Sequence, residues 1–122
     1  MKKNILHNKS LEEFHADLLS GKTSIFEVTD EIIENYNYSE AGKSAFVEFN
    51  KISIENAASV INGIEKNKFS LLGIPTSIKD LYGVNGYKTR AGTPKELPNK
   101  WEVQGPIVNT LTSHSSLITG KT

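Results

Sequence analysis

Short segments rich in β-forming residues alternate with amphipathic helical patterns along this chain, and that alternation limits the folds it can adopt. One such segment is SAFVEFN, residues 44–50, which alternates and is predicted to be a strand. Another is GIPTSIKD, residues 73–80, which has strand character and ends in a lysine and an aspartate. Helical patterns precede and separate the two. We therefore predict an α/β fold with helices over part of a mixed sheet, rather than a helical bundle.

The first two helices have clear start signals. Ser10 with Glu13, and Ser24 with Glu27, each fit a capping box in front of an apolar helical face. Gly21 is expected to end the first helix. The apolar stripes that follow at helical spacing are Leu11, Phe14, Leu18 and Leu19 in the first helix and Ile25, Val28, Ile32, Ile33 and Tyr36 in the second.

Local signals also divide the remainder. The polar segment 35–43, NYNYSEAGK, is predicted to be a loop. Ser53 is expected to cap a third helix, and Pro106 to open a last one, because a missing N–H costs little at the first helical position. Strand character returns in SLIT, residues 116–119. Together these signals predict one partial domain, with N-terminal helices in residues 1–43 and the start of an α/β core in residues 44–122.

The stretch from Leu72 to Gly105 differs in composition from the rest of the chain. It holds five of the nine glycines and three of the four prolines, which is typical of a surface loop. It also carries five large apolar side chains: Leu81, Tyr82, Val84, Tyr87 and Trp101. We expect the loop to fold onto the rest of the domain rather than to act as a tether.

The composition of the chain argues against several classes of function. The 122 residues contain 14 basic and 14 acidic side chains, so charge gives no case for a nucleic-acid or anionic-membrane partner. No cysteine is present, which excludes disulfides and thiolate chemistry. The three histidines are scattered, and no metal or cofactor is expected. The N-terminal stretch, residues 1–15, lacks the apolar run of a secretory signal, and no segment is long enough to span a bilayer. We expect a cytoplasmic protein.

Two further features of the sequence need an explanation. Lys79 ends the GIPTSIKD segment, and it is either a solvated lysine at a strand end or a base held in a dry site. The terminal GKT suggests a phosphate-binding loop, but that motif requires glycine at the position of Ser115. The order of elements here is also helix to strand, the reverse of a P-loop, so nucleotide binding is not expected.

Four blocks in order resemble the amidase signature family. They are the G-I-P-x-x-x-K-D segment at residues 73–80, a G-x-x-T-x-A-G-T loop ending at Thr93, a proline-started helix, and a strand ending in G-K-T. SAFVEFN followed by an alanine-bearing helix also fits. The likeness covers most of the chain, is strongest over residues 72–122, and concerns only the N-terminal portion of these enzymes. The segment HSS at residues 114–116 departs from the usual glycine-bearing turn.

The resemblance implies that the parent enzyme hydrolyses carboxylic amides, or transfers ammonia from them, with a triad of a nucleophilic serine, a second serine after a cis peptide, and a lysine. Lys79 matches the lysine. A serine hydroxyl needs a neighbour to take its proton, and burial lowers the pKa of a lysine because it penalises the charged form. A strand end directed into a sheet would supply that burial. Both serines would lie beyond Thr122, so the chain alone is predicted to be inactive.

For several residues near Lys79, the sequence leaves two interpretations of their role open. Asp80 either orients Lys79 or forms a turn, and the turn is the favoured role. Thr89, Gly92 and Thr93 fall in the family's loop near the active site, where they either contact substrate or only form the turn. Ser77 is expected on the same strand face as Lys79, but no oxyanion-hole glycines accompany it, so it is not predicted to be a nucleophile.

Two alternatives to an amidase fragment remain open. One is a non-catalytic remnant or interaction module whose sheet edge accepts a partner. The other is the amidase subunit of a tRNA-dependent amidotransferase. The expected partners are a small-molecule amide in the complete enzyme and either a second copy of the chain or the missing C-terminal portion.

Overall fold

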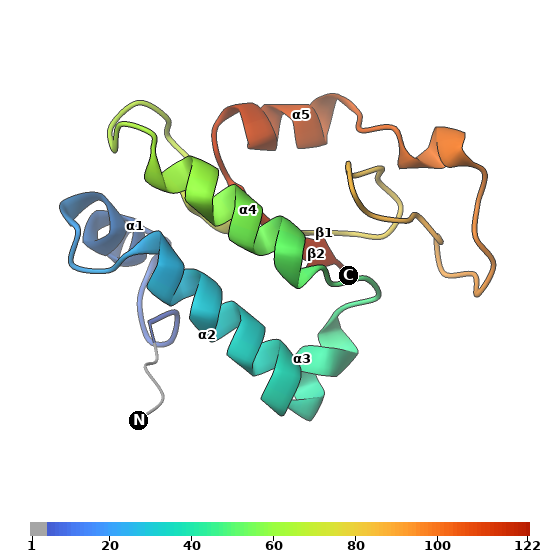
Figure 1. Ribbon diagram of the computed structural model, residues 1–122, viewed down its shortest axis with the longest axis horizontal. Helices are drawn as coiled ribbons and strands as arrows, with labels where there is room; N and C mark the ends of the chain where they lie inside the picture. Colours follow the sequence, from blue (N-terminus) through green and yellow to red (C-terminus); the bar gives the residue numbers. More distant parts are fainter. Residues whose placement is uncertain (1–4) are drawn as a thin grey trace.

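The computed structural model describes residues 5–122 and shows helices packed around two short parallel strands (Figure 1). The elements in chain order are α1 (Leu11–Ser20), α2 (Ile25–Tyr38), α3 (Glu40–Ala45), α4 (Lys51–Asn62), β1 (Pro75–Ile78), the 3-10 helix η1 (Asn99–Glu102), α5 (Pro106–Ser113) and β2 (Leu117–Lys121). The predicted α/β class is confirmed. The first four residues of the predicted helical region 1–43, and of the N-terminal stretch 1–15, lie outside the described residues.

Both predicted capping boxes are present. In α1 the Glu13 amide donates to the Ser10 hydroxyl at 3.1 Å, and the Ser10 amide donates to the Glu13 carboxylate at 3.0 Å. Ser24 and Glu27 repeat this pair of bonds at the start of α2. Gly21, with φ of 81°, ends α1 in the left-handed conformation that glycine adopts without strain. These two helices therefore begin where local hydrogen bonding dictates.

Two predictions in the middle of the chain are wrong. Residues 35–43 are not a loop: α2 continues to Tyr38, and the Ser39 hydroxyl then caps α3 by accepting from the Gly42 amide at 3.1 Å. Residues 44–50 form no strand and contribute only an isolated antiparallel bridge between Glu48 and Lys121. The aromatic rings in this segment instead gather around a ring of α2, with Phe49 stacked on Tyr36 at 3.9 Å between centroids.

The third helix also begins earlier than predicted. Asn50, not Ser53, is the N-cap of α4, and its side chain accepts from the Ser53 amide at 3.1 Å. Asparagine and serine are both strong N-caps, so the sequence offered two candidates three residues apart. Pro106 does open α5, as predicted.

β1 and β2 pair in parallel, and the connection between them runs through η1 and α5. The register places Pro75 opposite Leu117 and Ile78 opposite Lys121, with an irregularity between Thr76 and Ser77. A parallel pair requires a crossover connection of this kind. The strand predicted at 116–119 is thus confirmed, and it extends to Lys121.

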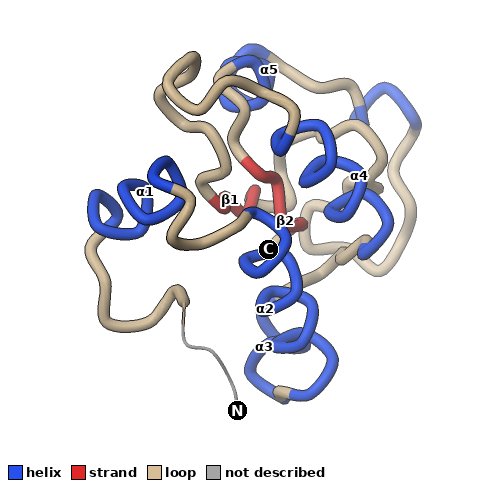
Figure 2. The backbone as a smooth tube through the Cα atoms, turned by 60° about the vertical axis from the view of Figure 1, so that its left-hand side comes forward, coloured by secondary structure: helices blue, strands red, loops and turns tan. Residues whose placement is uncertain are grey.

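Apolar side chains form two clusters on either side of the strands. α4 packs against α2 and against β2, and in Figure 1 it lies between α2 and the strand pair, while Figure 2 shows the strands near the centre of the molecule. The larger cluster joins the helices to the strand starts and consists of Ile5, Phe14, Leu18, Ile25, Val28, Ile32, Ile54, Ala58, Ile61, Leu72, Ile74 and Leu117. The smaller cluster consists of Ile78, Val84, Tyr87 and Val108.

The glycine-rich stretch is partly folded onto the domain, as expected. Val84 and Tyr87 are buried in the smaller cluster. Leu81, Tyr82 and Trp101 remain exposed, so the prediction is wrong for these three side chains. The stretch also approaches itself closely backbone to backbone, because a Cβ at Gly83 would lie 2.2 Å from the Val103 carbonyl oxygen. A similar approach occurs in β2, where a Cβ at Gly120 would lie 2.7 Å from the Glu48 carbonyl oxygen.

Within residues 5–122, no helix has the length and apolar character needed to cross a membrane.

Candidate active site

The two parallel strands end side by side, and the chain there is held by backbone bonds. The Thr122 amide, just past β2, donates to the Ile78 carbonyl at 2.9 Å, and the Asp80 amide donates to the Thr122 carbonyl at 2.7 Å. Lys79 lies between these two bonds, one residue beyond β1. In α/β proteins, ligands bind in the crevice outside the carboxyl ends of the strands. A ligand site is therefore expected at this edge.

A pocket of about 700 Å³ lies at this edge. Its lining residues are Val47, Lys79, Asp80, Leu81, Arg90, Ala91, Gly92, Thr93, Pro94 and Thr122. The structure thus brings four of the residues singled out from the sequence, Lys79, Asp80, Gly92 and Thr93, to one pocket. Thr89 is buried and does not line this pocket. Thr93 also closes its own turn, because its amide donates to the Arg90 carbonyl and its hydroxyl accepts from the Lys95 amide.

The burial expected for Lys79 is not found in this chain. The side chain is exposed, because the residue follows the last position of β1 and does not point into the interior of the sheet. Among residues 5–122, no side chain forms an ion pair or hydrogen bond with its ammonium group. Ser77 is exposed too, and no hydrogen bond joins it to Lys79 within those residues. The expectation of a dry lysine at a buried strand end is therefore wrong for this chain.

Asp80 has a role that neither predicted interpretation describes fully. It does lie in the turn that follows β1, where the Tyr82 amide donates to the Lys79 carbonyl at 3.1 Å. Its side chain, however, is buried, and the residue is only 5% exposed. Both carboxylate oxygens accept from the Arg90 amide, at 3.3 and 3.1 Å. Asp80 therefore links the turn after β1 to the turn that carries Arg90.

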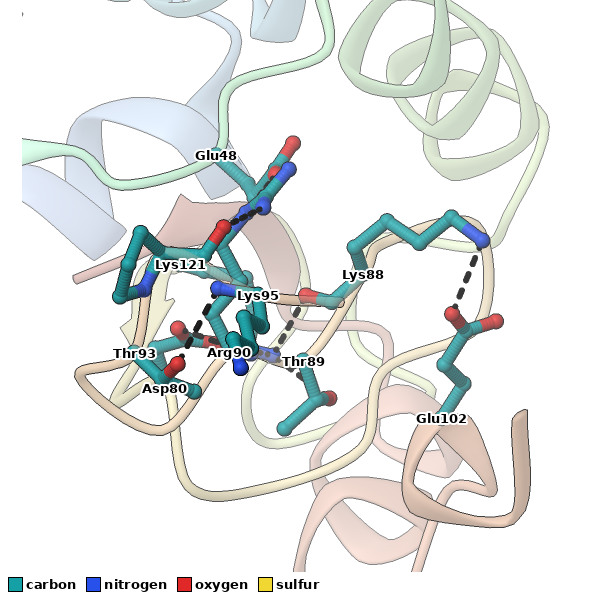
Figure 3. A network of polar contacts seen from close by, with 10 residues as sticks. Glu48, Asp80, Lys88, Thr89, Arg90, Thr93, Lys95, Glu102 and Lys121 are labelled. Carbon is teal, nitrogen blue, oxygen red and sulfur yellow. Dashed lines mark hydrogen bonds and ion pairs between the residues drawn. The ribbon is translucent and has the colours of Figure 1, made fainter. Parts of the chain in front are cut away.

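The buried lysine of this region is Lys121. Its side chain is fully buried and its ammonium group lies 2.9 Å from a carboxylate oxygen of Asp80. The same nitrogen donates to the Lys88 carbonyl and to the Thr89 hydroxyl, both at 3.2 Å. Figure 3 shows these groups converging between the turns. An ammonium group has three donors, so each has an acceptor and the charge is balanced by one carboxylate.

Sequence reasoning missed Lys121 because it considered the GKT segment only as a possible phosphate loop and as a family block. Lysine is almost never fully buried unless it is paired, so the burial of Lys121 at the end of β2 requires an acidic partner, and that partner is Asp80. The sequence alone does not distinguish Lys121 from Lys79, which also follows a strand and is exposed.

Arg90 and Lys88 hold the rim of the site. The Arg90 side chain donates to the Glu48 carboxylate at 3.1 Å and to the Pro94 carbonyl at 3.3 Å. The Lys88 ammonium lies 3.1 Å from the Glu102 carboxylate, and this bond raises the pKa of Lys88. Both pairs are visible in Figure 3, and they tie the loop to η1 and to the segment before α4.

The chain is similar in sequence to known proteins. The chain is 28% identical over 116 residues to 2-amino-5-chloromuconic acid deaminase of Comamonas testosteroni. It is 30% identical over 118 residues to the A subunit of glutamyl-tRNA(Gln) amidotransferase of Lactiplantibacillus plantarum. These alignments cover 93% and 94% of this chain but only 25% and 24% of the relatives. The chain therefore spans about a quarter of the length of the curated relatives it matches.

Solved structures agree on the fold. An amidase crystal structure superposes with a TM-score of 0.77 at 24% identity, over 93% of this chain and 26% of that one. A bacterial aryl acylamidase, described as an amidase signature enzyme, superposes with a TM-score of 0.74 at 20% identity, over 93% and 24%. The resemblance to the amidase signature family is confirmed. No family model matches the chain. Over 93% of its residues, the chain therefore has the fold of about a quarter of each of these two enzymes.

Proposed function

We propose that this chain is the lysine-bearing N-terminal portion of an amidase that hydrolyses carboxylic amides, and that Lys79 is the base of its Ser-cisSer-Lys triad. The observation that carries the proposal is the position of Lys79. It lies at the carboxyl ends of the two parallel strands and lines the pocket of about 700 Å³ there. The resemblance of the GIPTSIKD segment to the family supports the assignment.

The chemistry requires two partners that the 122 residues do not contain. A serine attacks the amide carbonyl, and a neighbouring group must accept its proton through the second serine. In this chain the Lys79 ammonium is exposed, whereas a base must be neutral. We propose that the serine-bearing portion covers the pocket and supplies both the serines and the desolvation that favours the neutral amine.

Two substitutions test Lys79 in the complete enzyme, in which the serine-bearing portion follows Thr122. Lys79→Ala is expected to lower kcat by at least about 10³-fold with little change in KM, within the range for loss of a general base. Lys79→Arg is expected to be nearly as harmful, because a guanidinium group does not give up its proton. Steady-state kinetics on a small amide measure both. An arginine variant that keeps more than about a tenth of the activity would remove Lys79 from the mechanism.

The isolated chain supplies the matching negative result. Because a lysine without serines has nothing to activate, purified 122-residue protein is expected to show no amide turnover. Turnover that disappears in Lys79→Ala would contradict the proposal, since it would mean that the chain holds its own nucleophile.

A second candidate within the family is the amidase subunit of a tRNA-dependent amidotransferase. The 30% identity to the Lactiplantibacillus plantarum protein favours it. Affinity purification from the native source distinguishes the two, because an amidotransferase subunit would bring a second protein with it and a free-standing amidase would not. A cytoplasmic location stays a prediction.

A further inference from the structure

We propose that Lys121 is a positioning residue that places Lys79 and the Arg90 turn, both of which line the pocket, through Asp80. The proposal rests on the proposed function of Lys79 and adds to it a group that never touches the substrate. Three observations carry it: the burial and full pairing of Lys121, the two segments that Asp80 joins, and the scarcity of other bonds at Lys79.

The first observation is the environment of the Lys121 ammonium group. It is fully buried and makes three contacts of 2.9–3.2 Å, to the Asp80 carboxylate, the Lys88 carbonyl and the Thr89 hydroxyl. Removing two charges from water is costly, and a well-packed apolar pair of similar size is often as stable or more stable. Stability alone is therefore a weak explanation for this pair, which defines one specific arrangement of three chain segments.

The second observation is what Asp80 connects. Its amide is bonded to Thr122 at the end of β2, and its carboxylate accepts from the amide of Arg90. Arg90 begins a turn that lines the same pocket as Lys79, through Gly92, Thr93 and Pro94. Lys121 binds the same carboxylate, so it holds together the two segments that line the pocket.

The third observation is how Lys79 itself is held. Its carbonyl accepts from the Leu81 and Tyr82 amides, and no bond to its side chain occurs among residues 5–122. Its backbone is held between Ile78 and Asp80, each bonded to Thr122, and of these two neighbours only Asp80 also has a side chain bonded to Lys121. A base must lie within about 0.5 Å of its productive position to be effective, so loosening this anchor should reduce the rate and leave the binding of the amide unchanged.

Amide hydrogen exchange on the 122-residue chain tests the placement directly. Lys121→Met should accelerate exchange at the Asp80 and Arg90 amides by at least tenfold more than at the amides of α1 and α2, where any loss of overall stability sets the background. Lys79→Met is the matched control and should change neither. Equal acceleration throughout the chain would show a general role in stability and overturn the proposal. No acceleration at either amide would also overturn it.

A neutral pair covers the case in which Lys121→Met does not fold. When Asp80→Asn is combined with Lys121→Met, no unpaired charge stays buried, while the introduced asparagine side chain retains an oxygen that can accept from Arg90. This variant should fold and still show faster exchange at residues 80 and 90. Wild-type exchange at both positions would overturn the proposal, because the fixed geometry would then not require the charged pair.

Kinetics of the complete enzyme separate this proposal from the proposed function. The neutral-pair variant should lower kcat at least tenfold with KM unchanged, whereas Lys51→Met, an exposed lysine on α4, should leave both unchanged. If Lys79→Ala abolishes activity but the neutral pair keeps full kcat, the positioning role fails and the function of Lys79 stands. If Lys79→Arg keeps its activity, the base assignment fails, while faster exchange at Asp80 and Arg90 would still support the placement of the pocket walls by Lys121.

Discussion

The helical region of the molecule and its loop-rich region are held together by different forces. The helices α1, α2 and α4 pack through one cluster of apolar side chains, in which Val28 and Ile54 have no exposed surface. The loop from Lys79 to Gly105 contributes only Val84 and Tyr87 to an apolar cluster. It is fixed instead by charged pairs, above all by the buried pair of Lys121 and Asp80.

This difference determines how much of each region's structure can be predicted from the local sequence. An apolar helix face is specified by spacing within some 15 residues, and its burial is non-directional. The pair of Lys121 and Asp80 joins residues 41 positions apart and requires the ends of two strands to meet. The helical region therefore depends on many apolar contacts specified by local spacing, whereas the loop-rich region depends on a few contacts between distant residues.

The largest effect on stability is expected where that single contact is removed. Lys121→Met should lower the free energy of unfolding by about 3–5 kcal/mol, because it leaves the Asp80 carboxylate buried without its countercharge. Lys79→Met, at the neighbouring strand end, should change it by less than about 0.5 kcal/mol. Urea denaturation of the two variants measures the difference. Similar values for both would mean that the two strand ends do not differ as described.

A core truncation in the helical region gives the reference for that value. Ile54→Ala should cost about 2–5 kcal/mol through lost burial and the cavity it leaves. Ile52→Ala, two residues earlier on the exposed face of α4, should cost less than about 0.5 kcal/mol. Thermal or urea unfolding followed by circular dichroism compares them. A large loss of stability in Ile52→Ala would contradict the exposure of this face of α4.

A smaller effect tests the local signals that specify the helices. Ser24→Ala removes the hydroxyl that accepts from the Glu27 amide and should cost about 1 kcal/mol. Ser24→Gly should recover most of that loss, because glycine is itself tolerated at the cap. Equal stability of Ser24→Ala and the wild type would show that tertiary packing alone sets the start of α2.

The smallest effect concerns Tyr87, and it appears only at alkaline pH. Burial raises the pKa of Tyr87 above its usual value of 10.0, and the Asn50 backbone opposes this less strongly. Its hydroxyl makes no hydrogen bond of normal geometry within residues 5–122. The unfolded chain then loses its proton first, so stability is complete below pH 10 and declines as pH rises through the higher folded pKa.

Tyr87→Phe removes this group and provides the comparison. At pH 7 the variant should differ from the wild type by less than about 1 kcal/mol, because no good hydrogen bond is lost. Above about pH 10 its stability should decline less steeply with pH than that of the wild type. Identical slopes in urea titrations at about pH 9, 10 and 11 would contradict the burial of this hydroxyl.

Much of the fold was predictable because its signals were local. Ser10, Ser24 and Pro106 mark helix starts by their own chemistry, and the structure confirms all three. The strand predicted at 44–50 does not form, because an alternating pattern does not determine which segment a strand will pair with. Phe46 and Phe49 instead contact an aromatic ring on α2, and only the backbone of Val47 and Glu48 bonds to β2 among the described residues.

The site was predictable only to a limited extent. The likeness of GIPTSIKD to a known family pointed to Lys79, and the structure places that residue in a pocket at the strand ends. An exposed Lys79 was only the less favoured of two alternatives, and the burial of Lys121 was not predicted at all. Both depend on where each strand stops relative to its neighbour, and a register irregularity between Thr76 and Ser77 changes that relation without a mark in the sequence.

The close backbone approaches at Gly83 and Gly120 also restrict how a chain of this kind can diverge. A methyl group at either position would overlap a carbonyl oxygen of another segment, at 2.2 Å for Gly83 and 2.7 Å for Gly120. Backbone atoms cannot change rotamer to make room, so no compensating side-chain substitution nearby can accommodate an alanine there. During evolution the exposed loop surface is therefore free to vary, while these two positions act as fixed points around which the variation must occur.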